Sequence, residues 1–337
     1  MNRKKSVLVT GATGLIGSHI VDELMKTDNA HVIALSHNKS KLEKVFGKYI
    51  GSDLFEYVDK DMGNHFDLAS ISQKYPIDVI LHAASPISGK IVNTRPVDVI
   101  RPNLIALESL FEGLAAQKSK TGVNGRIVIF SSATVYGVSP QRDINVSEPD
   151  TQSSDSLDSA GAAYSESKRM AEVMARAYVK QYGADAVIAR FGWVYGAASY
   201  PPETALFEFI NNAIRREDIR FKSSGQPKRD NIYIDDAVSG LFTVAEKGAA
   251  GEAYNISSGG ELGNFAAIDE IAEIIAETSG KELSNKISVI YESPAAGQPR
   301  KPGVLMKNDK LKALGWELKT SLADGIRAVL LEQSGAK

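Results

Sequence analysis

The fold prediction starts from the stretch Thr10-Gly11-Ala12-Thr13-Gly14-Leu15-Ile16-Gly17, which follows a short β-branched run and opens an amphipathic helical pattern. Its glycines stand at positions i, i+3 and i+6. In this pattern Gly11 allows a tight turn, Gly14 lets backbone amides approach a pyrophosphate, and Gly17 permits close packing of helix on strand. The N-terminus of the helix adds partial positive charge. The stretch therefore predicts a dinucleotide-binding turn.

Around this turn, short β-branched runs alternate with longer segments of helical period. The predicted strands are residues 6–10, 31–35, 54–58, 78–83, 126–131 and 186–190. Continuous apolar runs such as residues 79–81 and 127–130 suit strands that are covered on both faces. The alternation predicts an α/β fold: a Rossmann-type, doubly wound parallel sheet with right-handed crossovers.

The rhythm becomes less regular after about residue 190, and 337 residues are enough for about two units. We expect residues 1–190 to form the dinucleotide-binding domain, with residues 231–256 returning to it. Residues 191–230 and 257–337 are expected to form a smaller C-terminal α/β substrate-binding lobe. The polar stretch 147–163 precedes the helix with the candidate catalytic residues, and we interpret it as a mobile lid.

Composition excludes several classes of protein. The 39 Lys and Arg residues against 41 Asp and Glu leave a net charge of -2, which is no electrostatic footprint for nucleic acid or an anionic membrane. The chain has no cysteine, so disulfides, thiolate metal sites and cysteine nucleophiles are excluded. The five histidines show no close metal spacing, and no apolar run reaches 18 residues. We expect a soluble cytoplasmic protein without a metal.

The end of the second strand should carry an acidic residue if the adenosine ribose has a free 2′-hydroxyl. Ser36 stands there instead, followed by Asn38 and Lys39. Lys39, with Lys41, could neutralise a 2′-phosphate, so the sequence favours NADP over NAD. The alternative is that both lysines only solvate the next helix. Asp61, after the third strand, is either an acceptor for the adenine amino group or a surface carboxylate.

A second motif pairs a phenol with an ammonium group. Tyr164 and Lys168 stand four residues apart in a helical pattern and therefore on one face of the helix. Tyrosine, with a pKa near 10, is a poor base at neutral pH, but an adjacent cation lowers that pKa by stabilising the phenolate. Ser132 ends the fifth strand and could offer a hydroxyl to the same substrate oxygen, or could be a simple strand-end cap. The three residues predict a proton-transfer site at the carboxyl edge of the sheet.

In their order and spacing, residues 10–17, 131–137 and 164–168 resemble the extended short-chain dehydrogenase/reductase superfamily, and within it the NAD-dependent epimerase/dehydratase group of nucleotide-sugar enzymes. The likeness covers nearly the whole chain, with further matches at residues 82–84, 103, 190–196, 229–236, 254–256 and 314–316. It implies that Tyr164 is the acid/base and that Lys168 holds its phenolate and the nicotinamide ribose. Ser132 and Thr134 would bind the sugar.

The resemblance also implies the remaining contacts. The cofactor would be held by Gly11, Thr13, Gly14, Leu15, Ile16, Gly17, Ser36, Asn38, Lys39, Asp61, Met62, Ala83, Ala84 and Asn103, together with Tyr164 and Lys168. The nucleotide-diphosphate sugar would be held by Ser85, Ser132, Trp193, Arg229 and Arg300, with the two arginines facing the diphosphate. A homodimer is implied through a four-helix bundle, for which the predicted helices 102–116 and 163–181 are the candidates.

Several positions depart from the family pattern. The dehydratases carry an Asp-Glu pair directly after the hydroxyl residue, and the decarboxylases carry a glutamate at the second of these two positions. This chain has Ala133 and Thr134 there. Trp193 replaces an asparagine, and Gly303 stands where an acid is often found, so diphosphate recognition is expected to be altered. The string 132–137 resembles the 4-epimerases.

We therefore expect an NAD(P)-dependent nucleotide-sugar epimerase that oxidises and re-reduces a sugar carbon, C4 by preference, through a transient ketone. The alternative is an NADPH-dependent reductase of 4-keto-sugar nucleotides, which the missing acid at Ser36 favours modestly. A dehydratase or decarboxylase, and a non-catalytic dinucleotide-binding protein, are less favoured.

Overall fold

A parallel sheet of seven strands forms the centre of the computed structural model, which describes residues 3–71, 75–86, 88–137, 143–150, 156–159, 161–221, 227–292 and 303–336. The strand order is β11-β7-β5-β4-β1-β2-β3, and all neighbours are parallel. The strands are β1 (Lys5–Thr10), β2 (Ala30–Ser36), β3 (Phe55–Asp59), β4 (Val79–His82), β5 (Arg126–Ser132), β7 (Asp185–Phe191) and β11 (Ala253–Ile256). The predicted doubly wound sheet is confirmed. The order in which the chain adds strands to the sheet reverses between β1 and β4.

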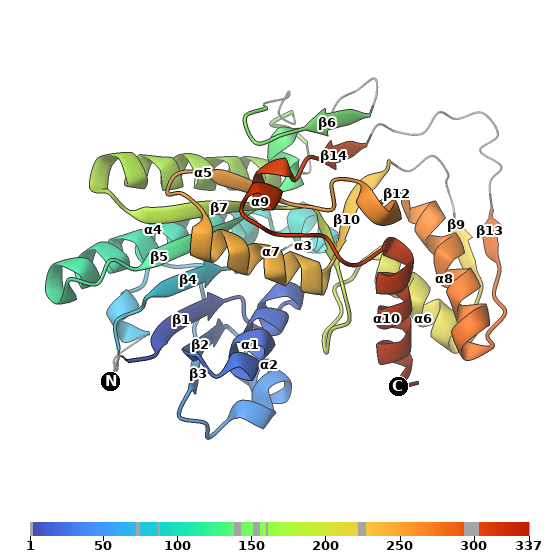
Figure 1. Cartoon of the computed structure of the whole chain (residues 1–337), viewed down its shortest axis with the longest axis horizontal. Coiled ribbons are helices and arrows are strands. Elements are labelled where there is room, and N and C mark those ends of the chain that lie inside the picture. The colour runs from blue at the N-terminus through green and yellow to red at the C-terminus, as the bar shows by residue number, and fades with distance from the viewer. Residues whose placement is uncertain are drawn as a thin grey trace.

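Helices cover both faces of this sheet, as the continuous apolar strands require. Figure 1 shows one face covered by α4 (Pro96–Thr121) and α5 (Ala162–Tyr182), and the other by α1 (Leu15–Thr27) and α7 (Ile234–Lys247). Along β1, Val7 and Val9 belong to the core under α1 and α7, whereas Leu8 belongs to the core under α4 and α5. The shorter helical elements around the sheet are α2 (Lys39–Phe46), η1 (Gly47–Tyr49), η2 (Leu68–Ser70), α3 (Gly89–Thr94) and η3 (Ala133–Tyr136).

The smaller lobe lies beside the carboxyl edge of the central sheet and has its own apolar core between α6 (Ala205–Arg215), α8 (Ile268–Leu283) and α10 (Leu322–Ser334) (Figure 1). A second sheet has the order β12-β10-β14-β6, and β8 also pairs with β10. The remaining elements of this part are β6 (Ile144–Val146), β8 (Trp193–Tyr195), β9 (Ile219–Phe221), β10 (Arg229–Tyr233), η4 (Glu261–Gly263), β12 (Phe265–Ala266), β13 (Val289–Tyr291), β14 (Val304–Met306) and α9 (Asp309–Ala313).

The chain crosses between the two sheets more than once. β11 lies in the central sheet although it follows β10 of the smaller sheet, and β6 joins the smaller sheet from within the first 190 residues. The domain boundaries at residues 190, 230 and 256 stay a prediction. Of the predicted lid, residues 151–155 and 160 lie outside the described residues. No described helix has the length and apolar character needed to cross a membrane.

Candidate functional site

The glycine turn after β1 packs against the segment that follows β4. This is the point in the sheet where the strand order reverses. Gly11 has a φ of 62°, and a Cβ there would lie 2.8 Å from the backbone of Ala84. A Cβ on Gly17 would lie 2.4 Å from the carbonyl oxygen of Gly11. The N-cap residue of α1 is Gly14, which makes no side-chain cap hydrogen bond. The turn therefore has the close packing and the uncapped helix end that a pyrophosphate needs.

The end of β2 differs in detail from the expectation. The hydroxyl groups of Ser36 and Thr13 lie 2.9 Å apart, and both side chains are buried. Asn38 caps α2, because its side-chain oxygen accepts a hydrogen bond from the amide of Lys41 at 2.9 Å. The ammonium group of Lys39 is exposed and lies 3.9 Å from the Glu43 carboxylate in the next turn.

Two further cations lie beside this position, and only one of them drew attention in the sequence. The ammonium groups of Lys41 and Lys44 lie 4.6 and 5.3 Å from the centre of the Tyr200 ring. Burial lowers the pKa of Lys41. Neither lysine forms an ion pair with a carboxylate in the part of the chain that the structure describes. The sequence gives no sign of the contact between Lys44 and Tyr200, because the ring comes from a loop about 160 residues further along the chain.

The candidates after β3 are less closely tied to the site. Asp61 accepts a hydrogen bond from the amide of Gly63 at 2.9 Å and is exposed, so its carboxylate closes a local turn. Met62 is buried in the core under α4 and α5. Their contacts with a cofactor stay a prediction.

A buried histidine holds the segment after β4. His82 is bonded through Nδ1 to the Thr10 hydroxyl at 2.9 Å and through Nε2 to the carbonyl oxygen of Pro102 at 3.1 Å. Because a carbonyl only accepts, Nε2 carries the proton and Nδ1 accepts from Thr10. Burial, with the charge of Lys168, lowers the pKa of His82 to about 4, so the ring stays neutral. The amide of Ala84 donates to the same Thr10 hydroxyl at 3.2 Å, which fixes the backbone facing Gly11.

Two polar groups beside this segment were predicted to bind ligands. The Ser85 hydroxyl is buried and has no hydrogen-bond partner among the described residues, which suits a group that faces a bound molecule. Asn103 on α4 donates through Nδ2 to the carbonyl oxygen of Val99 at 3.0 Å and to the Ser167 hydroxyl at 2.9 Å. Asn103 therefore ties α4 to the turn of α5 that carries Lys168.

The phenol and the ammonium meet at the carboxyl end of β5, as the sequence predicts. Lys168 is buried, its Nζ donates to the Phe130 carbonyl at 2.6 Å, and it lies 5.8 Å from the centre of the Tyr164 ring. Burial lowers the pKa of Lys168 to about 7. Burial raises the pKa of Tyr164, and its hydrogen bond with Ser132 acts in the opposite direction. Thr134 is exposed beside them, and its amide donates to the Ser132 hydroxyl at 3.3 Å.

On the side of the smaller lobe, the guanidinium carbon of Arg229 lies 3.6 Å from the centre of the Trp193 ring. The backbone pairing of β8 with β10 brings them together, and Trp193 is 45% exposed. Burial lowers the pKa of Arg229, and within the described ranges no carboxylate pairs with it. Such a guanidinium suits an anionic ligand. Arg300 lies outside the described residues.

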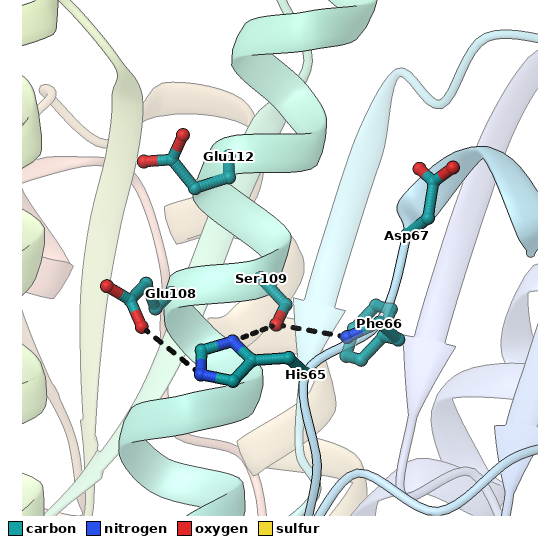
Figure 2. A pocket seen from close by; sticks show the side chains of 6 residues that line it. All are labelled: His65, Phe66, Asp67, Glu108, Ser109 and Glu112. Carbon is teal, nitrogen blue, oxygen red and sulfur yellow. Dashed lines mark hydrogen bonds and ion pairs between the residues drawn. The ribbon is translucent and has the colours of Figure 1, made fainter.

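A surface hollow beside α4 contains none of the predicted site residues. Figure 2 shows its lining, which consists of His65, Phe66, Asp67, Glu108, Ser109 and Glu112. His65 lies 3.3 Å from the Ser109 hydroxyl and 3.8 Å from the Glu108 carboxylate. That hydroxyl already donates to the carbonyl oxygen of Ile105, and Ser109 is buried. The trio is therefore no nucleophile system.

The site can be compared with known proteins. Residues 7–257 match the model of the NAD dependent epimerase/dehydratase family. The chain is 29% identical over 327 residues to the UDP-glucuronic acid decarboxylase 6 of Arabidopsis thaliana, covering 95% of this chain and 86% of that protein. It is 26% identical over 332 residues to the human dTDP-D-glucose 4,6-dehydratase, covering 97% and 89%.

Solved structures share the fold. The UDP-N-acetylglucosamine 4-epimerase from Methanobrevibacter ruminantium superposes with a TM-score of 0.79 at 22% identity, covering 100% of both chains. The UDP-glucuronic acid 4-epimerase from Bacillus cereus in complex with NAD superposes with a TM-score of 0.75 at 23% identity, covering 98% of this chain and 99% of that one. The match over residues 7–257 shows that the chain belongs to the NAD dependent epimerase/dehydratase family of enzymes.

Proposed function

We propose that this enzyme is an NAD(P)-dependent nucleotide-sugar 4-epimerase. The observation that carries the proposal is the absence of a carboxylate directly after Ser132, where the short helix η3 begins with Ala133 and Thr134. Elimination of water or carbon dioxide needs an acid or base next to the oxidised carbon. Neither a methyl group nor a hydroxyl group can serve as a carboxylate, so the hydride should move without loss of any substrate atom.

The residues around Tyr164 have the groups that such a reaction requires. A bound nicotinamide supplies the acceptor and donor of the hydride. The Tyr164 phenolate takes the proton of the sugar hydroxyl as the ketone forms and returns it when the other face of the carbon is reduced. Lys168 stabilises the phenolate by its positive charge, and the Ser132 hydroxyl orients the reacting oxygen. Because both the proton and the hydride return, the product is an isomer of the substrate.

For the cofactor we propose that NADP(H) binds at least as tightly as NAD(H). Ser36 rather than an acid ends β2, and the next helix, α2, carries the ammonium groups of Lys41 and Lys44 against the Tyr200 ring, with no carboxylate partner among the described residues. Titration of the apoprotein with both dinucleotides tests this, and Lys39→Gln and Lys41→Gln are each expected to weaken the binding of NADP(H) more than that of NAD(H). A clear preference of the wild type for NAD(H) would show that the lysines are only surface charge.

The substrate is proposed to be a nucleotide-diphosphate sugar that meets Arg229 through its phosphates, as a guanidinium without a described carboxylate partner permits. A homodimer through α4 and α5 is also proposed. On α5, Met170 and Val173 are 50% and 58% exposed, which leaves an apolar stripe for a second copy. Light scattering at several concentrations decides the assembly, and a monomer at all of them would contradict it.

The reaction is tested by incubating the enzyme with a panel of nucleotide sugars and measuring product mass. An epimerase leaves the mass unchanged, and NMR then identifies the inverted carbon. The second candidate, a reductase of 4-keto-sugar nucleotides, adds two mass units and consumes exchangeable NADPH; the missing acid at Ser36 favours it. A product lighter by about 18 or 44 mass units would show that another residue performs an elimination, and the proposal would be wrong.

A further inference from the structure

Helix α5 meets the end of β5 through three consecutive strand residues. Lys168 donates to the carbonyl oxygen of Phe130 at 2.6 Å. The Ser131 hydroxyl donates to the Glu172 carboxylate at 2.6 Å, and Ser132 is hydrogen-bonded to Tyr164. Tyr164, Lys168 and Glu172 follow one another at intervals of four residues, so all three lie on one face of α5. Only Tyr164 and Lys168 form the predicted phenol–ammonium motif, and Glu172 extends it by one further turn.

Glu172 is held in place by a buried arginine. Arg190 at the end of β7 donates through Nε to one carboxylate oxygen at 2.8 Å and through Nη2 to the other at 2.7 Å. The two side chains are 4% and 9% exposed. Burial by itself would raise the pKa of Glu172, but the hydrogen bonds and charge of Arg190 outweigh it, so the pKa stays below its usual value. Glu172 is therefore a carboxylate with a fixed orientation.

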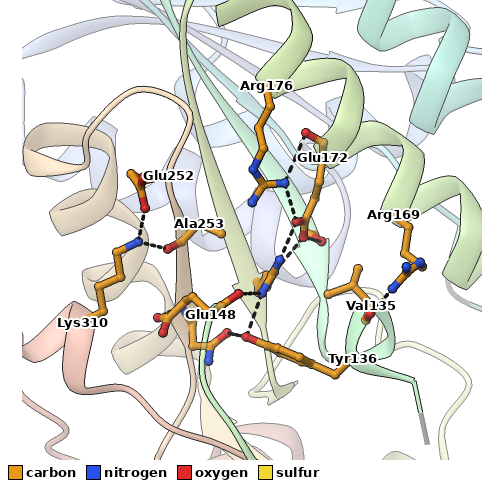
Figure 3. Close-up of polar contacts among 12 residues, drawn as sticks. Val135, Tyr136, Glu148, Arg169, Glu172, Arg176, Glu252, Ala253 and Lys310 are labelled. Atoms are coloured by element: carbon orange, nitrogen blue, oxygen red, sulfur yellow. Dashed lines mark hydrogen bonds and ion pairs between the residues drawn. The ribbon is translucent and has the colours of Figure 1, made fainter. Parts of the chain in front are cut away.

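The same arginine also contacts the segments that follow β5 and β6. Its Nη1 donates to the Tyr136 hydroxyl at 2.9 Å and to the carbonyl oxygen of Glu148 at 2.8 Å, and Figure 3 shows these contacts converging beside Glu172. The Tyr136 hydroxyl donates in turn to Asn255 on β11 at 2.7 Å. The segments after β5 and β6 thus hold Arg190 in place, and Arg190 in turn fixes the carboxylate of Glu172.

The charges around Lys168 make this carboxylate important. On α4, Asn103 is neutral, and at the end of β4, His82 is held neutral. On α5, Tyr164 carries no charge until it loses its proton. Burial lowers the pKa of Lys168, and the negative charge of Glu172 acts in the opposite direction. Arg190 and Arg176 are both bound to this carboxylate. Without that charge, a buried ammonium loses its proton more easily.

We propose that Glu172, oriented by Arg190, is a positioning residue that keeps α5 in register on β5 and keeps Lys168 protonated beside Tyr164. The inference rests on the proposed function, because Lys168 matters only if the Tyr164 phenol is the acid/base. It adds a residue that touches neither substrate nor cofactor and acts through Lys168. A merely structural role of the ion pair would change stability and leave the ionisation of Tyr164 unchanged.

The test is a pH titration of tyrosinate absorbance near 295 nm, with the enzyme saturated by oxidised cofactor. The phenol whose titration is present in the wild type and missing in Tyr164→Phe is Tyr164. In Glu172→Gln its midpoint should move up by about one pH unit, since the neutral lysine no longer stabilises the phenolate. Arg176→Gln is the matched control: it removes the exposed partner of Glu172, 3.1 Å away on the same helix, and should leave the midpoint unchanged.

Glu172→Gln leaves the buried Arg190 without its carboxylate partner and costs stability, so two more variants are measured. Glu172→Gln with Arg190→Gln removes both charges and should show a smaller upward shift, because the loss of the Arg190 charge offsets part of the loss of the carboxylate. Glu172→Asp keeps the charge and should restore most of the wild-type midpoint. An unchanged midpoint in folded Glu172→Gln or in the double variant overturns the proposal. The titration needs no substrate, so a failure to isomerise any nucleotide sugar would refute the epimerase assignment alone.

Discussion

The packing of Gly17 leads to a quantitative prediction for Gly17→Ala. The new Cβ would lie 2.4 Å from the carbonyl oxygen of Gly11, whereas real Cβ atoms keep about 3.0 Å or more. The start of α1 and the glycine turn must therefore separate by roughly 0.6 Å. Overpacking of this kind costs about 1–3 kcal/mol, against a helix-propensity gain of up to about 1 kcal/mol for alanine over glycine. We expect the free energy of unfolding to fall by about 1–2 kcal/mol.

The same movement displaces the amides at the N-terminus of α1 from the place where a pyrophosphate would bind. We expect the dissociation constant for the dinucleotide to rise at least about tenfold, which corresponds to about 1.4 kcal/mol. Calorimetric titration with both dinucleotides and denaturant unfolding measure the two effects. The matched control is Gly280→Ala in α8, where a Cβ meets nothing within 4 Å, and stability should rise by about 0.5–1 kcal/mol with affinity unchanged. If Gly17→Ala behaves like this control, the turn does not bind the cofactor as argued.

Three further variants test the centre of the site. Tyr164→Phe removes the proton carrier but keeps the ring, so turnover should fall at least about a hundredfold with cofactor affinity nearly unchanged; wild-type turnover would refute its role. Lys168→Met should reduce turnover and weaken cofactor binding together, because one ammonium serves both, and kinetics with calorimetry would reveal either effect alone. His82 has a pKa of about 4 in the fold against 6.5 when unfolded, so the unfolded state binds its proton first as the pH falls. Between pH 6.5 and 4 the wild type should therefore lose about 3 kcal/mol more stability than His82→Gln, and parallel denaturation curves would contradict this.

Local pattern was enough to predict six of the seven strands of the central sheet, all but β11, and the glycine turn. Each of the six predicted strands coincides with a strand of the structure to within one residue at either end. Apolar runs and the spacing of Gly11, Gly14 and Gly17 act over a few neighbouring residues, so they can be interpreted without knowledge of the fold. The pairing of Tyr164 with Lys168 follows from helical periodicity in the same way.

Contacts between distant segments could not be predicted in this way. Arg190 lies 18 residues after Glu172, and Tyr200 lies about 160 residues after Lys41; neither spacing carries a periodic signal. The stacking of Arg229 on Trp193 depends on the register between β8 and β10, which is set by the packing of the smaller lobe.

The amino-acid sequence thus specified the parallel strands, the dinucleotide turn and the phenol–ammonium pair, because each depends on residues that are close neighbours in the sequence. The tertiary structure decided which groups surround them: that Thr13 binds the Ser36 hydroxyl, that Lys41 and Lys44 share an aromatic partner, and that Glu172 stands fixed beside Lys168. Burial also decided the ionisation of Lys168 and His82, since desolvation is a property of the folded surroundings and of no sequence motif.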